Sequence, residues 1–341
     1  MHHPPRPALS RRLLLGACAA AGVAGLGHAA RAAAGPLRIR FSHVVSEDTP
    51  KGLTALRLQA LVAQRSGGRM AVEVYPDAQL YGDDDEFEAL QTGAVDLLAP
   101  SLSKFGRVGF PEFEVFDLPF LFDNLDEVRR VTQGGVGRRL LGDLHRQGLV
   151  GLGFFDNGFK HMSADRPLRE VSDFRGLRLR VQSSRVIAAQ MRALGARPVP
   201  LPFSATREAL AHGIVQGTEN PLSNFWTQGM HEVQPHLSLT RHGYLGYAVI
   251  TSERFWSRLP GADQRLLRTA LEEAITFGNR VTQTQHDKAL ASLRAWGRTT
   301  IHEPTTAQRA SLARAVEPVY AELGRSIGAA WIRDVRRAIR A

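Results

Sequence analysis

The chain has 341 residues, of which 43% are hydrophobic and 22% are charged, and it carries a formal net charge of +10. A chain of this length buries substantial cores and suggests about two domains. Its 18 prolines and 32 glycines stay below the share typical of low-complexity chains, so the composition does not indicate a disordered or repetitive protein. The positive charge does not indicate nucleic-acid binding, because the basic residues are scattered among acids without a basic stripe.

The N-terminal segment has the pattern of an export signal. Arg11 and Arg12 precede an apolar run over residues 13–26, and small residues follow as far as Ala34. This order predicts a cleaved signal peptide over residues 1–34 and a periplasmic mature protein, and paired arginines are also a feature of twin-arginine signals. A membrane anchor is the alternative, but fourteen apolar residues fall short of the roughly 20 that span a bilayer.

The only cysteine, Cys18, lies inside this segment. Residues 15–18, LGAC, resemble a lipoprotein box, which leaves lipidation as a less favoured alternative because the apolar stretch continues beyond the cysteine. The mature chain is expected to have neither thiol chemistry nor a disulfide. Its stability must therefore come from its cores.

The first half of the mature chain alternates between strand and helix patterns. Residues 49–64 carry Leu53, Leu56, Ala60 and Leu61 at helical spacing, and residues 83–91 begin a second helix. Short apolar or alternating runs predict strands over residues 37–41, 70–75 and 95–99. This succession of strand, helix and strand predicts a parallel sheet.

The second half continues this alternation and then becomes wholly helical. Strands are predicted over residues 149–155, 177–181, 214–219 and 244–251, and helices over residues 185–194 and 204–211. From Gly261 the pattern predicts a long helix over residues 262–296 and two more helices before the C-terminus. The sequence therefore predicts an α/β protein of two lobes with a helical tail.

Three short motifs suggest catalysis or metal binding, and none has the context that such chemistry requires. Residues 324–328, GRSIG, match a nucleophile elbow, but helical patterns flank them and no histidine follows. His231 and His236 are five residues apart rather than four, with Pro235 between them. The acidic run over residues 83–86 lacks calcium-loop spacing and fits the N-terminus of a helix. We therefore expect no enzymatic activity, no cofactor and no metal.

Motifs along most of the chain, from Leu37 to Asp334, resemble those of a known family. In order they read FSHVVSEDTPKG, YPDAQLYGDDDEFEALQTGAVDLLAPSLSKF, FEVFDLPFLF, DNGFKHMS, GLRLRVQSS, VQGTENPLSN and HGYLGYAVI. These segments resemble the solute-binding proteins of tripartite ATP-independent periplasmic (TRAP) transporters, in the branch that binds four-carbon dicarboxylates. The resemblance covers nearly all of the predicted mature chain.

The resemblance implies a two-lobed periplasmic binding protein fold. Each lobe would be a mixed β-sheet flanked by helices, with a long helix spanning both lobes. The implied first lobe comprises residues 35–157 and 246–285, and the implied second lobe comprises residues 158–245 and 286–341. The long helix predicted over residues 262–296 fits the spanning helix.

The resemblance also implies a carboxylate site centred on Arg180, at the end of a predicted strand. A planar guanidinium offers parallel donors that match a carboxylate, so it fixes orientation as well as charge. Asn220 matches an asparagine that bonds the same carboxylate, and Phe203 matches an aromatic residue that walls the pocket. A structural ion pair, a loop cap and ordinary core packing are the respective alternatives.

Further candidates are less specific. Lys160 stands where several relatives place a second arginine, and Ser101 and Lys104 match positions that reach the ligand from the first lobe. Capping or solvent-facing roles are about as well supported for His43, Lys51 and Ser183.

The implied function is capture of a small carboxylate, for which malate, succinate and fumarate are the expected examples. Cleft closure would then present the protein to the small and large membrane subunits of the transporter, with no nucleic acid involved. The same fold could instead bind a keto, aromatic or sugar acid, or serve as a ligand sensor for a signalling receptor. A periplasmic enzyme and a transcription-factor effector domain are less favoured, since no catalytic cluster and no helix-turn-helix pattern is found.

Overall fold

The computed structural model describes residues 35–341, and the predicted signal peptide with Cys18 lies outside the described residues. As far as residue 98 the first half alternates between strands and helices as predicted, and a run of helices over residues 102–147 that was not predicted follows. Its elements, with 3-10 helices labelled η, are β1 (Leu37–Ser42), α1 (Pro50–Ser66), β2 (Met70–Tyr75), α2 (Glu86–Thr92), β3 (Leu97–Leu98), η2 (Leu102–Val108), η3 (Pro111–Asp117), α3 (Leu125–Thr132), α4 (Gly135–Asp143), η4 (Leu144–Gln147) and β4 (Leu149–Ala164).

The second half ends in helices, also as predicted, although three short helices rather than two follow the long one. Its elements are η5 (Val171–Phe174), β5 (Arg178–Val181), α5 (Arg185–Ala193), β6 (Arg197–Pro200), η6 (Phe203–Ala205), α6 (Thr206–Ala211), β7 (Gly217–Asn220), α7 (Leu222–Thr227), η7 (Met230–Glu232), β8 (His236–Ser252), α8 (Glu253–Trp256), α9 (Gly261–Trp296), β9 (Thr300–His302), α10 (Thr306–Val316), α11 (Pro318–Ile327) and α12 (Ala329–Arg340).

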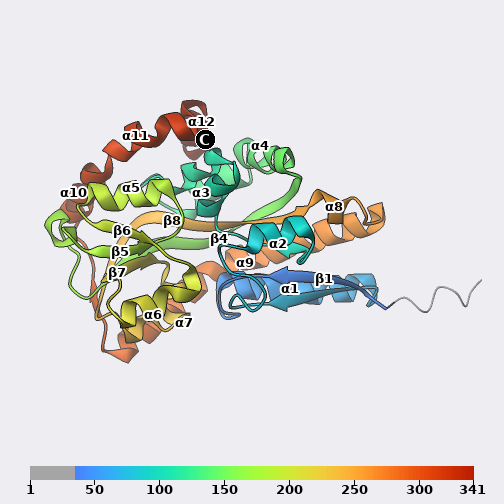
Figure 1. The fold of residues 1–341 in the computed structure, drawn as a ribbon, viewed down its shortest axis with the longest axis horizontal. Helices are drawn as coiled ribbons and strands as arrows, with labels where there is room; N and C mark the ends of the chain where they lie inside the picture. Colours follow the sequence, from blue (N-terminus) through green and yellow to red (C-terminus); the bar gives the residue numbers. More distant parts are fainter. Residues whose placement is uncertain (1–34) are drawn as a thin grey trace, which may run out of the picture. The chain divides into compact units, whose positions relative to one another are not determined.

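The nine strands of residues 35–341 belong to one hydrogen-bonded sheet, in the order β2-β1-β3-β8-β4-β7-β5-β6, with β9 paired to β8. The long strands β4 and β8 are antiparallel and form its centre, whereas β1 with β3 and β5 with β6 and β7 are parallel pairs on either side. Figure 1 shows α1 and α9 below β4 and β8, and α3, α4 and α5 above them. The predicted α/β class, a mixed sheet flanked by helices, is confirmed.

The strand β4 is interrupted by irregularities of pairing. Its register with β8 shifts between Gly151 and Gly153, between Asp156 and Gly158, and again between Lys160 and Met162. Such bulges insert an extra residue, bend the strand and re-aim its side chains. The middle of β4 therefore directs side chains to two different polar regions, which are described below.

Local signals explain why α1 and α9 form where they do. The Thr49 side chain accepts a hydrogen bond from the Gly52 N–H, and Pro50 occupies the first turn of α1, where its missing N–H costs nothing. The α9 helix runs for 36 residues and ends at Gly297, whose φ of 69° continues no helix. Gly278 allows α1 to approach closely, because a Cβ there would lie 2.1 Å from the Thr54 Oγ1.

The buried apolar residues form three clusters. One lies between α1, the N-terminal half of α9 and the strands β1, β2 and β3, and another surrounds α6, α7 and the C-terminal end of α9. The largest joins α3, α4 and η3 to α5, α11 and α12. This cluster combines residues of both implied lobes. Residues Arg38–Ala341 form one compact unit, so the division into two lobes stays a prediction.

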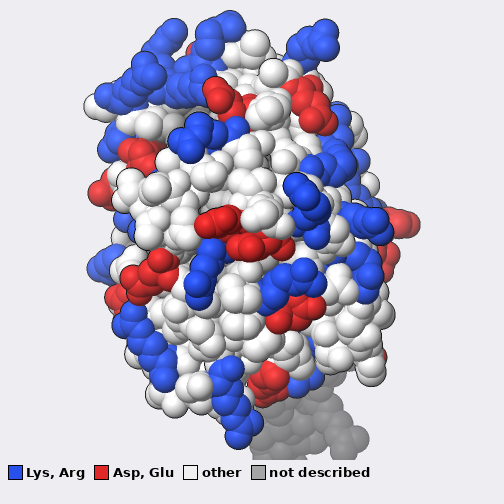
Figure 2. Space-filling model, turned by 90° about the vertical axis from the view of Figure 1, so that its left-hand side faces the viewer, with Lys and Arg blue, Asp and Glu red and all other residues white. Residues whose placement is uncertain are grey.

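The surface charge is mixed, as the sequence indicates. Figure 2 shows acidic and basic side chains interspersed over most of the visible face, with basic side chains gathered along the top, the end at which α11 and α12 lie. The exposed arginines of α12 are Arg333, Arg336, Arg337 and Arg340. Within residues 35–341, no helix combines the length and the apolar character needed to cross a bilayer.

Candidate functional site

Five of the nine predicted site residues line one small cavity. They are Lys51 at the start of α1, Ser101 and Lys104 at the start of η2, Phe203 on η6 and Asn220 at the end of β7. The cavity measures about 20 Å³, which is room for about one water molecule. The groups around it therefore lie nearly in contact, and a larger molecule can enter only if they move apart.

Arg180 lies beside this cavity, on β5, with 1% of its surface exposed. Its Nε donates to the Leu201 carbonyl at 3.0 Å, and its guanidinium carbon lies 5.6 Å from the centre of the Phe203 ring. Within the part of the chain that the structure describes, the buried Nη1 has no hydrogen-bond partner. Burial lowers the pKa of Arg180, although the nearby carboxylates of Asp83 and Glu219 oppose this shift. The arginine therefore keeps donor capacity that an acceptor at the cavity could use.

Lys104 is held by two carboxylates. Its ammonium lies 2.5 Å from the Asp83 Oδ1 and also pairs with Glu86. The other Asp83 oxygen accepts a hydrogen bond from the Phe203 N–H at 2.6 Å. Burial alone would raise the pKa of Asp83, but the Lys104 ammonium outweighs it and holds the value at about 2. Two acids of the run that sequence analysis assigned to a helix N-terminus thus face inward and neutralise Lys104.

Lys51 is the cavity cation without such a partner. It is 1% exposed, and its ammonium lies 3.8 Å from the centre of the Tyr247 ring, in a cation–π contact. Among residues 35–341, no carboxylate lies within ion-pairing distance of it. Burial, followed by the positive charge of Lys104, lowers the pKa of Lys51 to about 7. Lys51 can therefore gain more from a bound anion than Lys104 can.

Lys160 does not line the cavity. It is 1% exposed, and its ammonium lies 2.7 Å from the Glu219 Oε2, which is also 3.5 Å from the His242 Nε2. Burial would raise the pKa of Glu219, but the Lys160 charge prevails and lowers it to about 2. The Glu219 carboxylate also opposes the lowering of the Arg180 pKa, so we expect the Lys160–Glu219 pair to support that arginine rather than contact the ligand.

The two remaining candidates also lie off the cavity. His43 is 1% exposed and packs edge-on against Phe41, with ring centres 6.1 Å apart. Burial, with a smaller effect from Lys51, lowers the pKa of His43 to about 3, so the ring is neutral. Ser183 accepts a hydrogen bond from Arg107 at 3.2 Å and does not reach the cavity wall.

Several cavity residues escaped sequence analysis. The polar ones are Asp83, Gln182, Asn224 and Tyr247, and the apolar ones are Val44, Val45 and Leu245. Gln182 is adjacent to the predicted Ser183 and accepts a hydrogen bond from Ser101 at 2.7 Å. The signal for Tyr247 was its place in the HGYLGYAVI motif, but only the pairing of β8 within the sheet brings its ring to Lys51.

A set of polar bonds joins the segment that follows β5 to η2 and η3. Besides the bond between Ser101 and Gln182, the Asp117 carboxylate accepts from Ser103 at 2.6 Å and from Ser184 at 2.7 Å. Arg185 donates to both oxygens of Glu114, at 3.1 and 2.7 Å. Burial raises the pKa of Asp117 to about 6. These bonds hold one wall of the cavity against the other.

The motifs that sequence analysis set aside have structural roles. Residues 324–328 lie at the end of α11, with no strand before them. His231 stacks on Trp226 with ring centres 4.1 Å apart, and His236 pairs with His302. In residues 35–341, no cluster of three or more His, Cys, Asp or Glu side chains could hold a metal ion.

Comparison with known proteins identifies the family. Residues 41–326 match the family described as "Bacterial extracellular solute-binding protein, family 7". The chain belongs to this family. It is 46% identical to the C4-dicarboxylate-binding periplasmic protein DctP of Rhodobacter capsulatus over 330 residues, which are 97% of this chain and 99% of the relative. The predicted membership among TRAP solute-binding proteins is confirmed.

Solved structures of relatives share the fold. A TRAP periplasmic solute-binding protein from Shewanella oneidensis with bound succinate is 39% identical, with a TM-score of 0.87 over 89% of this chain and 99% of that one. A sugar acid binding protein from Advenella mimigardefordensis in complex with galactonate is 30% identical, with a TM-score of 0.87 over 90% of this chain and 98% of that one. Proteins of this fold thus bind acids of different sizes.

Proposed function

We propose that this protein is the binding component of a TRAP transporter that captures a four-carbon dicarboxylate, such as malate, succinate or fumarate. It would deliver the ligand to the small and large membrane subunits and catalyse no reaction. The observation that carries the proposal is that Lys51 from α1 lines the cavity while Arg180 from β5 packs against the ring of Phe203, which also lines it. Names and bound ligands of relatives support it.

The proposed site gives each carboxylate its own partner. Arg180 and Asn220 would bind one carboxylate, beside the Phe203 ring. Lys51 would meet the other, since Lys104 is already neutralised by Asp83 and Glu86. A charge-assisted hydrogen bond contributes about 1.5 to 3 kcal/mol, so three or four of them, net of ordering costs, reach about −8 kcal/mol, which corresponds to micromolar binding.

We also propose that the two implied lobes, residues 35–157 with 246–285 and residues 158–245 with 286–341, close around the ligand. The bonds of Ser101, Asp117 and Glu114 to residues 182–185 would then cross the cleft and favour the closed form. A ligand that bridges Arg180 and Lys51 makes both sets of contacts only when the lobes are closed. Its differential affinity would therefore shift the equilibrium toward closure.

The test of this function is calorimetry of the purified mature protein with succinate and with butyrate, which differ by one carboxylate. Succinate is expected to bind at least about tenfold more tightly, because the second carboxylate meets Lys51 rather than entering a dry cavity unpaired. Equal affinities would contradict the dicarboxylate assignment. Tighter binding of galactonate would favour a sugar acid instead, the second candidate, which the Advenella relative supports.

Dicarboxylate binding is expected to weaken as the pH rises above 7. The Lys51 ammonium is charged below its pKa of about 7, and a bound carboxylate favours that charged form, so binding above pH 7 takes up a proton. The dissociation constant for fumarate, measured by calorimetry, should rise at least about tenfold between about pH 6 and pH 9.

A Lys51→Met variant serves as the control for this pH dependence. It should bind fumarate weakly at every pH and lose most of the dependence. Asp117, whose pKa is about 6, also titrates in this range. If the dissociation constant still depends on pH in Lys51→Met, the pH dependence comes from Asp117. A dissociation constant that is independent of pH in the unmodified protein would show that Lys51 does not face the ligand.

We further propose that residues 1–34 are an export signal that is removed, through either the general or the twin-arginine route. The basic pair Arg11–Arg12, the apolar run and the small residues before Gly35 support this, as does the periplasmic name of the Rhodobacter relative. Mass spectrometry of the periplasmic protein is expected to show a chain that begins near Gly35. A periplasmic chain that still begins at Met1 would refute cleavage.

A further inference from the structure

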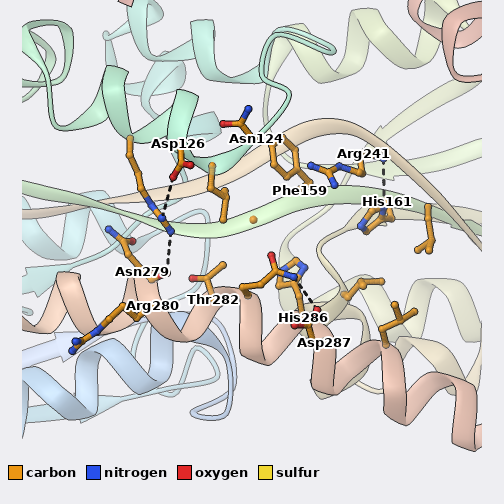
Figure 3. A pocket seen from close by; sticks show the side chains of 17 residues that line it. Asn124, Asp126, Phe159, His161, Arg241, Asn279, Arg280, Thr282, His286 and Asp287 are labelled. Carbon is orange, nitrogen blue, oxygen red and sulfur yellow. Dashed lines mark hydrogen bonds and ion pairs between the residues drawn. The ribbon is translucent and has the colours of Figure 1, made fainter. Parts of the chain in front are cut away.

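A cavity larger than the candidate ligand site lies elsewhere in the described part of the chain. It is a groove of about 520 Å³ between α9, the middle of β4, β8 and the start of α3. Figure 3 shows Asn124, Asp126 and Phe159 above this groove, with Thr282 and His286 of α9 below it. We call it the α9–β4 groove. Its volume lies within the range of small-molecule pockets, roughly 300 to 1,000 Å³.

Arg241 is one of three arginines that line the groove. Its guanidinium lies over the Phe159 ring (Figure 3), 4.6 Å from the ring centre. One of its nitrogens donates to the Asp123 carbonyl at 2.9 Å. No carboxylate of residues 35–341 lies within ion-pairing distance of it. Its backbone has a φ of 47°, a left-handed conformation that is costly for arginine and that tends to persist at functional positions. The remaining N–H groups of this guanidinium can serve an anion.

Three of the other charged groups that line the groove already have partners. Arg129 bonds the buried Asp156 at 2.8 Å and lies 3.7 Å from Asp126, and the Asp287 carboxylate accepts from Gln283 at 2.8 Å. Arg280 also lines the groove, but Figure 3 shows its side chain extending away from the interior. Arg241 is therefore the cation that an entering anion would meet.

The walls near Arg241 suit a flat or apolar body. Phe159, Leu239 and Leu290 are apolar, and His161 and His286 are 6% and 9% exposed. Burial lowers the pKa of both histidines, so their rings are neutral at neutral pH. The groove thus combines one available guanidinium with apolar and neutral aromatic surface, which fits an organic anion with one carboxylate on a planar or apolar body.

A short chain of hydrogen bonds connects the groove to the candidate ligand cavity. The His286 Nε2 lies 2.7 Å from the Asn157 carbonyl, and the Asn157 side chain donates to the Asn224 Oδ1 at 2.9 Å. Asn224 lines the ligand cavity. Gly158, with a φ of 111°, leaves no room between β4 and His286, because a Cβ there would lie 2.7 Å from the histidine nitrogen. A movement of α9 against β4 would therefore also displace Asn224 in the wall of the ligand cavity.

We propose that the α9–β4 groove is a second binding site, which takes a monocarboxylate with a planar or apolar body and thereby strengthens binding in the ligand cavity. We expect the two sites to strengthen rather than weaken each other, because hydrogen bonds hold the walls of the ligand cavity together in this structure. A ligand that fits the groove in this arrangement favours the same arrangement of the cavity. The coupling rests on the proposed function, whereas the site itself does not.

The test uses benzoate as the probe. Benzoate is titrated by calorimetry into the ligand-free mature protein and, in a second experiment, into the mature protein saturated with succinate. Crystallography then gives the position of the bound benzoate. It is expected to bind in the groove under both conditions, and saturating benzoate should tighten succinate binding about fivefold. Arg241→Ala should weaken benzoate about tenfold, through loss of a charge-assisted bond, and leave succinate binding without benzoate unchanged.

Two further variants keep this test decisive. Arg268→Ala is the matched control, because Arg268 also lies over an aromatic ring, that of Trp256 at 4.6 Å, but does not line the groove. It should leave benzoate binding unchanged. Leu290→Trp should block benzoate by filling the groove while Arg241 stays in place, which covers the case that Arg241→Ala fails to fold.

The outcomes separate the groove from the proposed function. Benzoate binding that survives both Arg241→Ala and Leu290→Trp, or that disappears when succinate saturates the protein, would overturn the second site. Benzoate in the groove with no effect on succinate affinity would overturn the coupling. Failure of succinate to bind the unmodified protein would refute the dicarboxylate function, while groove binding of benzoate without succinate would still stand.

Discussion

Replacing Arg180 with Ala is expected to raise the dissociation constant for a four-carbon dicarboxylate at least about 100-fold. The substitution leaves a desolvated ligand carboxylate without its paired donors, which costs about 3 kcal/mol or more. Arg180→Lys should recover binding only in part, since an ammonium lacks the planar fork of a guanidinium. Calorimetry gives the affinities. The ligand-induced shift of the melting temperature should vanish in Arg180→Ala, because that shift grows with ligand concentration relative to the dissociation constant.

The ligand-free fold should tolerate this change. The structure buries Arg180, with one hydrogen bond from its Nε to the Leu201 carbonyl and an Nη1 that has no partner among the described residues. Removing an incompletely paired buried charge relieves part of its desolvation cost. The control is Arg178→Ala on the same strand, whose exposed side chain bonds the carbonyls of Gly213 and Ile214. Unchanged affinity in a normally folded Arg180→Ala would show that the arginine is structural.

Replacing Lys160 with Met is expected to lower the free energy of unfolding by about 3 to 5 kcal/mol. The variant leaves the Glu219 carboxylate buried without its ammonium partner, and breaking one side of a buried ion pair has an effect of this size. Urea denaturation of the ligand-free protein measures it. The double variant Lys160→Met with Glu219→Gln should recover much of the loss, because it removes the stranded charge.

Lys288→Met is the control for Lys160, since Lys288 is exposed on α9 and should have little effect on unfolding. The resemblance to TRAP binding proteins placed Lys160 among the ligand contacts, and this experiment separates the two roles. If Lys160→Met unfolds at the same urea concentration as the unmodified protein but binds dicarboxylate at least about tenfold more weakly, the lysine contacts the ligand and the supporting role is wrong.

Regular periodicity made several elements predictable. The long helix predicted over residues 262–296 is found at Gly261–Trp296, and the strand predicted over residues 70–75 is found at Met70–Tyr75. The strand β4 was predicted only as far as residue 155 but continues to Ala164. Its second part carries Asp, Asn, Lys and His and is buried almost throughout, so neither alternation nor an apolar run marked it. Pairing with β8 and β7 on its two sides sustains it.

The sequence by itself determined the long helix and the helical C-terminus, seven of the nine strands of residues 35–341, the family and the candidate arginine, because these depend on local periodicity and contiguous motifs. Only the tertiary structure decided which cations remain for a ligand. Lys104 pairs with Asp83 and Glu86, and Lys160 pairs with Glu219. Of the cations that line the cavity, Lys51 beside Tyr247 is then the one without a carboxylate partner among the described residues. The strength of such pairs depends on distance and burial in space, and separation along the chain specifies neither.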